Sequence, residues 1–476
     1  MMTLPAHKTK IVCTIGPASD THEILAQMIQ VGMSIARLNF SHGDFESHRR
    51  AIASLREAEK KTGRRVTIMA DLPGPKIRIG SIEKEPIELK PGAVFRLTTE
   101  TAVGDLDRVS VTFSRLPKVV KPGDGLYLND GLIRLEVLDI VGNDVICKIK
   151  AGGLLYSRKG LNLPGIDLGI PAFTDWDRTC LTFALEQGLD AVSQSFVEKG
   201  SDVAAVREAA ASLGGSPFII AKIERAGALD HLDEILREAD GIMIARGDLG
   251  VEIPIEEMAV VQKALMDRPN RLGKPVITAT QMLESMTHNL RPTRAEATDV
   301  ANAVLDGTDC VMLSGESAIG LYPVEATAML ARITAAIEPH HKCDRVLEAV
   351  NTGQEHEATS PTELIALSVE RVLNFRTPAA LIVPTLSGRT ARSIARFRLP
   401  HWITAVSPLE STCRLLQFSY GVYPECEPDY PDDWKAWTRH WMKTYGISGG
   451  LAVLTEGPSD KNPAANHRLE LLELGD

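Results

Sequence analysis

The segment FIIAKIE at residues 218–224 is followed, 23 residues later, by GIMIARG at 241–247. Each is a short apolar run with many β-branched residues, which is typical of a strand buried on both faces. The residues between the two runs have a helical pattern. A strand and a helix in roughly 25 residues make one βα unit, so the pair predicts two adjacent parallel strands.

Six further runs of the same kind extend this pattern in both directions: KIVCTIG at 10–16, IARLNF at 35–40, VTIMADL at 66–72, AVSQSFV at 191–197, KPVITAT at 274–280 and CVMLSGE at 310–316. The starts of consecutive runs are separated by 25, 31, 125, 27, 23, 33 and 36 residues. Eight βα units specify a (β/α)₈ barrel, the TIM barrel. We therefore predict an α/β protein whose barrel comprises residues 1–72 and 170–340.

The 125-residue interval is longer than one βα unit requires. Removing about 30 residues for that unit leaves about 95, enough for a small inserted domain. Residues 73–169 carry alternating strands and closely spaced hairpin turns, such as NDG at 129–131 and GND at 142–144. We predict that this insert forms a small β-barrel.

Beyond about residue 340, strands and helices alternate at a different spacing. The pattern predicts a helix and four strands, at 361–375, 379–386, 402–407, 422–426 and 450–454. The polar and acidic stretch 354–360 is a candidate linker. Residues 350–476 are therefore predicted to form a separate C-terminal domain with α/β layers.

The composition excludes several classes of protein. The 476 residues suffice for about three domains. The 52 basic and 62 acidic residues give a formal net charge of −10, which disfavours a basic nucleic-acid binder. No apolar run approaches the roughly 18 residues of a membrane span, and the first eight residues lack the apolar core of a signal peptide. Seven cysteines without a CxxC pair predict reduced thiols in the cytoplasm.

In barrels of this kind the working residues lie at the carboxyl ends of the strands. Polar side chains gather at these predicted ends: Arg37, Asn39, Ser41, Asp71, Lys76, Arg78, Lys222, Glu224, Arg246, Asp248, Thr280 and Ser314. One such cation alone would be read as part of a structural ion pair. Several ionisable groups at the same end of a barrel favour a functional site.

Glu224 and Asp248 lie one βα unit apart, so they are expected on neighbouring strand ends. Two carboxylates could be helix caps, but with Lys222 on the face of Glu224 they suit Mg²⁺. The four cations Arg37, Lys76, Arg78 and Lys222 on an acidic protein predict an anionic small substrate, such as a phosphate. Phosphoryl transfer needs positioned groups that neutralise charge of this kind.

Nine segments resemble the pyruvate kinase family, and together they extend over nearly the whole chain: TKIVCTIGPAS at 9–19, ARLNFSHG at 36–43, DLPGPKIR at 71–78, LPGID at 163–167, IAKIE at 220–224, DGIMIARGDLGVEIP at 240–254, ITATQMLESM at 277–286, RPTRAE at 291–296 and MLSGES at 312–317. The resemblance implies reversible phosphoryl transfer from phosphoenolpyruvate to ADP, giving pyruvate and ATP. It also implies Mg²⁺ or Mn²⁺ as cofactor and a cytoplasmic homotetramer.

The resemblance implies that Lys222 stabilises the moving phosphoryl group, that Arg37 binds the phosphate, and that Glu224 and Asp248 hold the divalent metal. On the substrate side, it implies that the carboxylate is held by Ala245, Arg246 and Gly247, that Arg78 is a further arginine, that Thr280 lies near the enolate carbon, and that Ser314 lies in the segment tied to protonation of the enolate. The nucleotide is expected to contact Asn39, His42, Arg78 and Lys159. A monovalent cation is expected to be surrounded by Asn39, Ser41 and Asp71.

The chain departs from the potassium-dependent members of this family at two positions. Those members have a threonine and a glutamate where this chain has Leu72 and Lys76. Leu72 removes an oxygen ligand, and Lys76 supplies a fixed ammonium where bound K⁺ would supply charge. We therefore predict catalysis that does not require K⁺, with a merely solvated Lys76 as the alternative.

The loop Thr385, Leu386, Ser387, Gly388, Arg389 and Thr390 follows a predicted strand and opens a helix, so its N–H groups could bind a phosphate. A simple helix cap is the alternative. In the family this loop binds phosphorylated effectors. The segment 455–461 lacks the arginine of the members regulated by fructose 1,6-bisphosphate, so a different effector, such as a sugar monophosphate, is expected.

Two other features are read as structural. The sequence HHKC at 340–343 is expected to be a solvated turn, and Trp434, Trp437 and Trp441 share one helix face, as in a core or a subunit interface. Two other functions stay open: a different Mg²⁺-dependent barrel enzyme that handles a pyruvate enolate, such as a lyase or aldolase, and a non-catalytic sensor of sugar phosphates. The insert and the Lys222–Glu224 pair favour the kinase.

Overall fold

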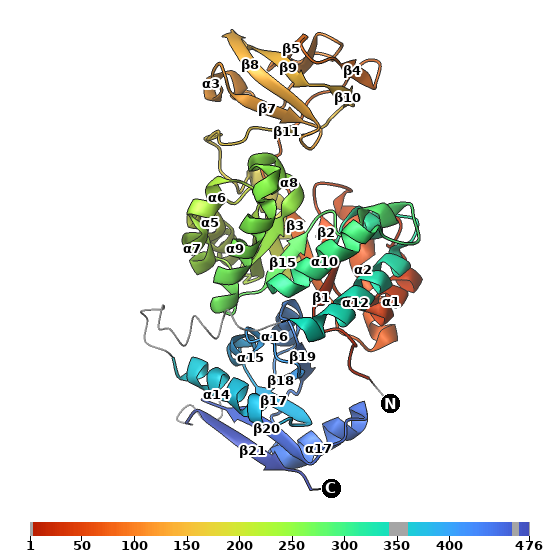
Figure 1. Cartoon of the computed structure of the whole chain (residues 1–476), viewed down its shortest axis with the longest axis vertical. Coiled ribbons are helices and arrows are strands. Elements are labelled where there is room, and N and C mark those ends of the chain that lie inside the picture. The colour runs from red at the N-terminus through yellow and green to blue at the C-terminus, as the bar shows by residue number, and fades with distance from the viewer. Residues whose placement is uncertain (1–2, 342–359, 459–465, 476) are drawn as a thin grey trace.

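The structure is a computed structural model that describes residues 3–341, 360–458 and 466–475. Figure 1 shows three parts along its long axis. The barrel occupies the middle, the insert lies beyond one end of it, and the C-terminal domain lies beyond the other. Among the described residues, no helix is both long enough and apolar enough to cross a bilayer.

Eight parallel strands close into a barrel in the order β1-β16-β15-β14-β13-β12-β3-β2. Their bounds are β1 (Lys10–Thr14), β2 (Met33–Asn39), β3 (Thr67–Leu72), β12 (Ala191–Gln194), β13 (Phe218–Ile223), β14 (Gly241–Ala245), β15 (Val276–Ala279) and β16 (Cys310–Leu313). Each falls within or overlaps a predicted run. The predicted TIM barrel is therefore confirmed.

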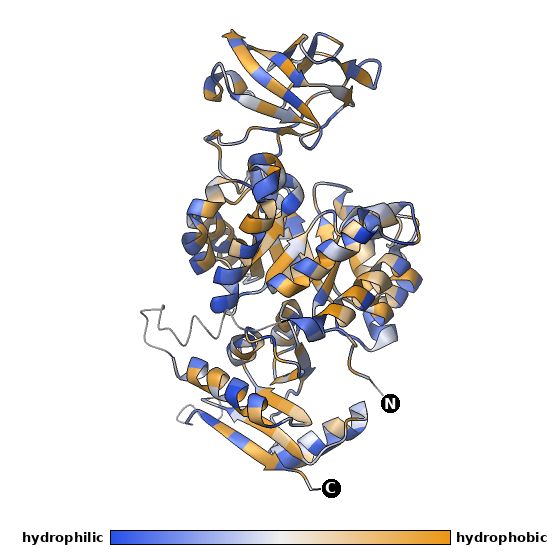
Figure 2. Cartoon of the chain, in the orientation of Figure 1, coloured by the Kyte–Doolittle hydropathy of each residue, from blue (hydrophilic) through white to orange (hydrophobic). Residues whose placement is uncertain are grey.

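A ring of helices surrounds these strands, with their apolar faces inward (Figure 2). The eight that follow the strands in turn are α1 (His22–Val31), α2 (Phe45–Thr62), α4 (Asp175–Glu186), α5 (Gly200–Ser212), α7 (Leu232–Glu238), α9 (Met258–Arg271), α10 (Arg294–Asp306) and α12 (Pro323–Ile337). Three short helices extend loops at the strand ends: α6 (Gly227–Asp230), α8 (Arg246–Glu252) and α11 (Gly315–Ala318). Capping boxes, such as that of Thr293 and Glu296 on α10, fix where helices begin.

The insert consists of two sheets around one hydrophobic core. The six-stranded sheet has the order β11-β7-β8-β9-β5-β6, and β10 pairs with β4. The elements of the insert are β4 (Ile87–Leu89), β5 (Val94–Thr98), β6 (Arg108–Ser110), α3 (Leu116–Val119), β7 (Gly125–Leu128), β8 (Ile133–Val141), β9 (Asp144–Ala151), β10 (Gly153–Leu155) and β11 (Leu161–Asn162). The predicted turns at 129–131 and 142–144 join β7 to β8 and β8 to β9. Arg78 bridges to Gly160 beside β11, and Ile79 bridges to Val111 beside β6, so this short segment links the two edges of the larger sheet, as expected for a small β-barrel.

The C-terminal domain is a five-stranded sheet in the order β19-β18-β17-β20-β21, flanked by helices. Its elements are α14 (Pro361–Phe375), β17 (Ala380–Pro384), α15 (Arg389–Ala395), β18 (Ile403–Ser407), α16 (Glu410–Leu415), β19 (Val422–Cys426), α17 (Trp434–Tyr445), β20 (Leu451–Glu456) and β21 (Arg468–Glu473). The predicted α/β domain is confirmed. Strand β21 was not predicted, because its RLELLE sequence favours a helix locally and antiparallel pairing with β20 overrides that preference.

Candidate active site

Alternation along the strands selects which polar side chains enter the barrel. Ile220 lies in the cluster of buried residues inside the barrel, whereas Ile219 and Ala221 pack outward against the helices. Residues two apart on a strand share a face, so Lys222 and Glu224 continue the inward row that Ile220 begins. The same rule places Arg37 after Ile35 and Asp71 after Met69, both of which lie inside the barrel.

Asp71 is the centre of the cluster at the carboxyl ends. Asn39 and Ser193 are its register partners on the neighbouring strands β2 and β12. Arg37 Nε donates to Asp71 Oδ2 over 2.9 Å, and Ser193 Oγ donates to Asp71 Oδ1 over 2.8 Å. Burial alone would raise the pKa of Asp71, but the Arg37 guanidinium and the Lys222 ammonium hold it well below its usual value. Asp71 is therefore a fixed negative charge at working pH.

The Lys222 ammonium is held in place by oxygen atoms of three side chains. Its Nζ lies 2.8 Å from Glu224 Oε1 and 3.2 Å from Asp71 Oδ1, and donates to Ser195 Oγ over 2.6 Å. Burial would lower the pKa of Lys222, but the two carboxylates raise it above its usual value. The residue is only 6% exposed, so its side chain presents a permanent, immobilised positive charge at the floor of the site.

Glu224 and Asp248 offer oxygen atoms that fit a divalent metal. Glu224 Oε2 accepts a hydrogen bond from the backbone N–H of Phe196 over 2.9 Å. Asp248 has neither a hydrogen bond nor an ion pair with any described residue, and its side chain is open to solvent at the rim. Crowding by protein atoms and the Glu224 charge raise the pKa of Asp248 to about 6. Two hard, mutually repelling carboxylates suit Mg²⁺ or Mn²⁺.

Lys76 lies on the segment that leads from β3 into the insert. The buried carboxylate of Asp177 ties this segment to the barrel, since it accepts from Gly74 N and from Thr174 N, each over 2.8 Å. Burial and the Lys222 charge lower the pKa of Lys76, while Asp71, Glu224 and Asp248 raise it in part. The Lys76 ammonium therefore lies within electrostatic range of the whole cluster, although water also reaches it.

The end of β15 has a strained backbone. Thr280 and Gln281 have φ angles of 69° and 54°, which non-glycine residues rarely adopt. Thr280 Oγ accepts from Gly247 N over 2.7 Å and donates to the Ala279 carbonyl over 2.7 Å. Arg246 supports this turn from below, and its guanidinium donates to the Thr280 carbonyl and to Asp299, over 2.8 and 2.7 Å. The side chain of Arg246 is thus committed to the protein.

The other predicted site residues occupy several places. Ser314 follows the inward residue Met312 at the end of β16, and its N–H donates to Glu316. Asn39, the register partner of Asp71 on β2, accepts a hydrogen bond at its Oδ1 from Ser41 N over 3.1 Å. The pKa of His42 is lowered by burial and by three nearby cations, Lys76, Arg78 and Arg37.

Two predicted nucleotide residues belong to the insert and its connection. Arg78 donates to the Arg158 carbonyl over 2.9 Å, which fixes its position between the barrel and the insert. Lys159 Nζ lies 6.0 Å from the Tyr156 ring centroid. The hairpin tip that carries Asp130 approaches the barrel, because a Cβ on Gly131 would lie 3.2 Å from Val251 on α8.

Three supporting residues were not predicted: Ser193, Ser195 and Phe196. The serines are buried and contact Asp71 and Lys222. Phe196 has a φ of 60° and turns its N–H toward Glu224. The available signal was the serine pair two apart at the end of the fourth predicted strand, which marks one inward face.

The predicted effector loop lies in the C-terminal domain, between β17 and α15. Gly388 has a φ of 78°, and its N–H donates to Thr385 Oγ over 3.0 Å. Ser387 and Arg389 are exposed. On α17 the tryptophans pack together as expected, with the Trp441 and Trp437 indoles donating to Glu425 and Glu427. Residues 342 and 343 of the predicted HHKC turn, and 354–359 of the predicted linker, lie outside the described residues.

Comparison with known proteins gives consistent results. Two family models match, "Pyruvate kinase, barrel domain" over residues 6–327 and "Pyruvate kinase, alpha/beta domain" over 363–463. A pyruvate kinase of Thermococcus litoralis is 47% identical over 428 residues, covering 89% of this chain and 90% of the relative. Pyruvate kinase 2 of a Synechocystis strain is 41% identical over 471 residues, covering 96% and 78%. The crystal structure of a Cryptosporidium parvum pyruvate kinase superposes with a TM-score of 0.92 at 37% identity, covering 99% of this chain and 97% of that one.

Proposed function

The chain belongs to the pyruvate kinase family of phosphotransferases, and we propose that the cluster around Lys222 transfers the phosphoryl group of phosphoenolpyruvate to ADP. The observation that carries this proposal is the Lys222 ammonium, fixed by Asp71, Glu224 and Ser195. Phosphoryl transfer needs a preorganised positive charge where negative charge spreads over the moving group. Arg37 adds a second cation on the same inward level and binds the substrate phosphate.

Glu224 and Asp248 would hold Mg²⁺ or Mn²⁺, which when bound supplies further positive charge to the substrate oxygens. Lys222 contacts Glu224, so the lysine charge lies directly beside the proposed metal site. The backbone around Ala245 and Gly247 takes the substrate carboxylate. Arg246 contributes by holding the end of β15 in place, because its guanidinium binds Asp299 and Thr280.

After transfer, the enolate of pyruvate must gain one proton on carbon. Thr280 and Ser314 directly follow the adjacent strands β15 and β16, and we assign proton delivery to a path that they line. The insert acts as a lid that brings Lys159 toward the nucleotide, with Arg78 at its connection and Asn39 and His42 on the barrel side. This arrangement keeps bulk water away from the phosphoryl group.

A coupled assay tests the proposal. With Mg²⁺, phosphoenolpyruvate and ADP, the full chain should form ATP and pyruvate in equal amounts. Absence of ATP formation would favour the two other functions, a different enolate-handling barrel enzyme or a non-catalytic sensor of sugar phosphates. Release of pyruvate without ATP would favour the first of these. The assignment to the cytoplasm and the homotetrameric state are further proposals that follow from the family.

We also propose that Lys76 replaces the monovalent cation. Its ammonium interacts electrostatically with Lys222, Asp71, Glu224 and Asp248, where a K⁺ would balance the same carboxylates. In this proposal the residues around the Lys76 ammonium do not coordinate a monovalent cation. They are Asn39, Ser41 and Asp71. Leu72 is fully buried in the cluster that packs against the helices, so its side chain points away from these residues, and the proposal rests on Lys76.

Replacing K⁺ by tetramethylammonium should leave the turnover of the parent enzyme within about twofold, because the charge is covalently attached. Lys76→Glu should lose about tenfold or more in tetramethylammonium and recover in K⁺. Lys84→Glu, an exposed lysine of the insert, is the charge-matched control. A parent enzyme that stops without K⁺ would contradict the proposal.

The loop from Thr385 to Thr390 is proposed to bind the phosphate of an effector, with Ser387 and Arg389 exposed beside the backbone of Gly388. Ser387→Asp should abolish activation by sugar monophosphates at low phosphoenolpyruvate, because a carboxylate repels the phosphate. Saturation curves with and without each sugar phosphate measure this. Ser368→Asp on α14 is the control. If Ser387→Asp leaves the activation curves unchanged, this loop does not bind the effector.

A further inference from the structure

Two cysteines of the C-terminal domain lie close together on the side that faces the barrel. Cys413 is on α16, and Cys426 is the last residue of β19, which lies next to α16 at this boundary (Figure 1). Glu410, the first residue of α16, precedes Cys413 by three positions, so the two share a helix face. The two Sγ atoms and one Glu410 carboxylate oxygen all lie within 4.8 Å of one another. The proposed transfer reaction makes no use of this cluster.

The cluster is buried on one side and open to solvent on the other. The Cys413 thiol is buried and donates to the Glu425 carbonyl on β19 over 3.4 Å. Cys426 is half-buried, and the Glu410 side chain is 45% exposed. Burial raises the pKa of Cys413 to about 12, so its thiol stays protonated until a cation displaces the proton. A cation can therefore enter from the solvent side and keep a water molecule there.

Two arginines hold the Glu410 carboxylate in position. Arg65, which precedes β3 of the barrel, donates from Nε to Oε1 and from Nη2 to Oε2, each over 2.9 Å. Arg414 Nη2 lies 3.1 Å from Oε1. Burial would raise the pKa of Glu410, but the hydrogen bonds and the charge of Arg65 lower it below its usual value, so the group is an anion. Carboxylates that bind metals are themselves held by hydrogen bonds of this kind.

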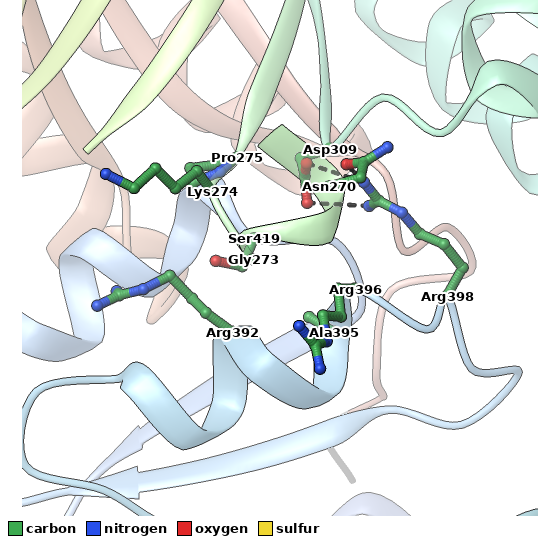
Figure 3. Close-up of a pocket in the computed structure, with 10 residues that line it drawn as sticks. All are labelled: Asn270, Gly273, Lys274, Pro275, Asp309, Arg392, Ala395, Arg396, Arg398 and Ser419. Atoms are coloured by element: carbon green, nitrogen blue, oxygen red, sulfur yellow. Dashed lines mark hydrogen bonds and ion pairs between the residues drawn. The ribbon is translucent and has the colours of Figure 1, made fainter. Parts of the chain in front are cut away.

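A second arginine–carboxylate pair at the same boundary shows what a saturated carboxylate looks like. Arg398 binds both oxygens of Asp309, each over 2.9 Å (Figure 3). The backbone N–H groups of Tyr420 and Val276 donate to the same two oxygens, so each Asp309 oxygen accepts two hydrogen bonds. In Glu410, by contrast, Oε2 contacts only one of the two arginines. It therefore keeps a lone pair for a further partner beside the thiols.

We propose that Cys413, Cys426 and Glu410 bind a thiophilic divalent cation such as Zn²⁺, with water as the fourth ligand. Two thiolates and a carboxylate carry three negative charges, the cation supplies two positive charges, and the two arginines lie beside the remaining negative charge. Tetrahedral zinc accepts sulfur and carboxylate oxygen together, whereas Mg²⁺ requires oxygen ligands. Binding forms two metal–sulfur bonds and releases two thiol protons to water, with no change of oxidation state.

Titration with Co²⁺ separates this site from the transfer cluster, because thiolate ligands give an intense sulfur-to-cobalt charge-transfer band and oxygen ligands do not. The full chain is titrated with its thiols reduced and with Mg²⁺ in excess. The band should saturate at one Co²⁺ per chain, and Zn²⁺ should abolish it. Cys413→Ser and Cys426→Ser should each weaken binding by about a hundredfold or more, and Glu410→Gln by about tenfold. Cys147→Ser, which changes a buried cysteine of the insert, is the matched control and should leave the titration unchanged.

Melting curves in the same Mg²⁺ buffer give a second readout. Zn²⁺ should raise the melting temperature of the parent and of Cys147→Ser more than that of the two other cysteine variants, and curves without Zn²⁺ establish that each variant folds. A parent chain without the charge-transfer band would overturn the proposal. A band that survives unchanged in Cys413→Ser or in Cys426→Ser would overturn it as well. Neither measurement depends on ATP formation, so failure of the transfer assay would count against the proposed function alone.

Discussion

Replacing Lys222 with methionine should slow ATP formation from phosphoenolpyruvate and ADP by about a thousandfold. Methionine keeps a similar length and removes only the charge. The ammonium is 2.8 Å from Glu224 Oε1 and is fixed before substrate arrives, so no reorganisation is needed when negative charge develops on the phosphoryl group. The turnover number in the coupled assay measures the loss, and Lys60→Met on the exposed face of α2 is the control.

This variant also allows two roles of Lys222 to be separated. If the lysine acts on the phosphoryl group, exchange of the methyl protons of pyruvate with D₂O should fall much less than ATP formation does. Thr280→Ala should show the reverse order, because Thr280 is assigned to the proton path. Equal losses of exchange and transfer in Lys222→Met would make the lysine the proton donor instead. Because Glu224 loses a buried partner, the melting temperature should drop and must be compared first.

Much of this site could be predicted because two rules act over short stretches of chain. The βα period located all eight barrel strands, and strand alternation then placed Arg37, Asp71 and Lys222 inside. Charged residues at the ends of apolar strands stand out in a sequence. Because burying a charge without a partner is unfavourable, such residues indicate a cluster of paired groups. Ser193 and Ser195 are uncharged, so only their spacing of two residues marks them, and their role depends on which strand lies next to β3.

Contacts between distant segments decided the remaining features. Arg246 could be placed at a strand end, but its commitment to Asp299 depends on how α10 packs beside β15. The bond of Asp177 to Thr174 is a local capping box, but its bond to Gly74, on the other connection of the insert, is not indicated by the sequence of its helix. The net charge of −10 is similarly uninformative, since cations are concentrated both at the transfer cluster and at the boundary between the barrel and the C-terminal domain.

Asp248→Asn should lower turnover by about a hundredfold or more and weaken Mn²⁺ binding strongly, without destabilising the fold. Asp248 has no partner among the described residues, so its replacement leaves no buried cation unpaired. Glu224→Gln is the informative contrast, because it removes the partner of Lys222 and should lower both activity and melting temperature. Electron paramagnetic resonance of free Mn²⁺ gives the affinity, and calorimetric melting gives the stability.

Comparison of the parent and Asp248→Asn over a range of pH, by melting temperature and Mn²⁺ affinity, distinguishes a metal ligand from a structural carboxylate. The ordinary aspartate pKa is 3.8, and in the fold it is raised to about 6. The folded protein therefore binds a proton that the unfolded chain lacks, so the contribution of Asp248 to stability is present below 3.8 and is lost as the pH rises through 6. Metal-free Asp248→Asn should then melt at or above the parent temperature at pH 8. Parent Mn²⁺ affinity should fall by about tenfold per pH unit below 6, because proton and metal compete for one carboxylate. Unchanged Mn²⁺ affinity in the variant would show that Asp248 is not a ligand.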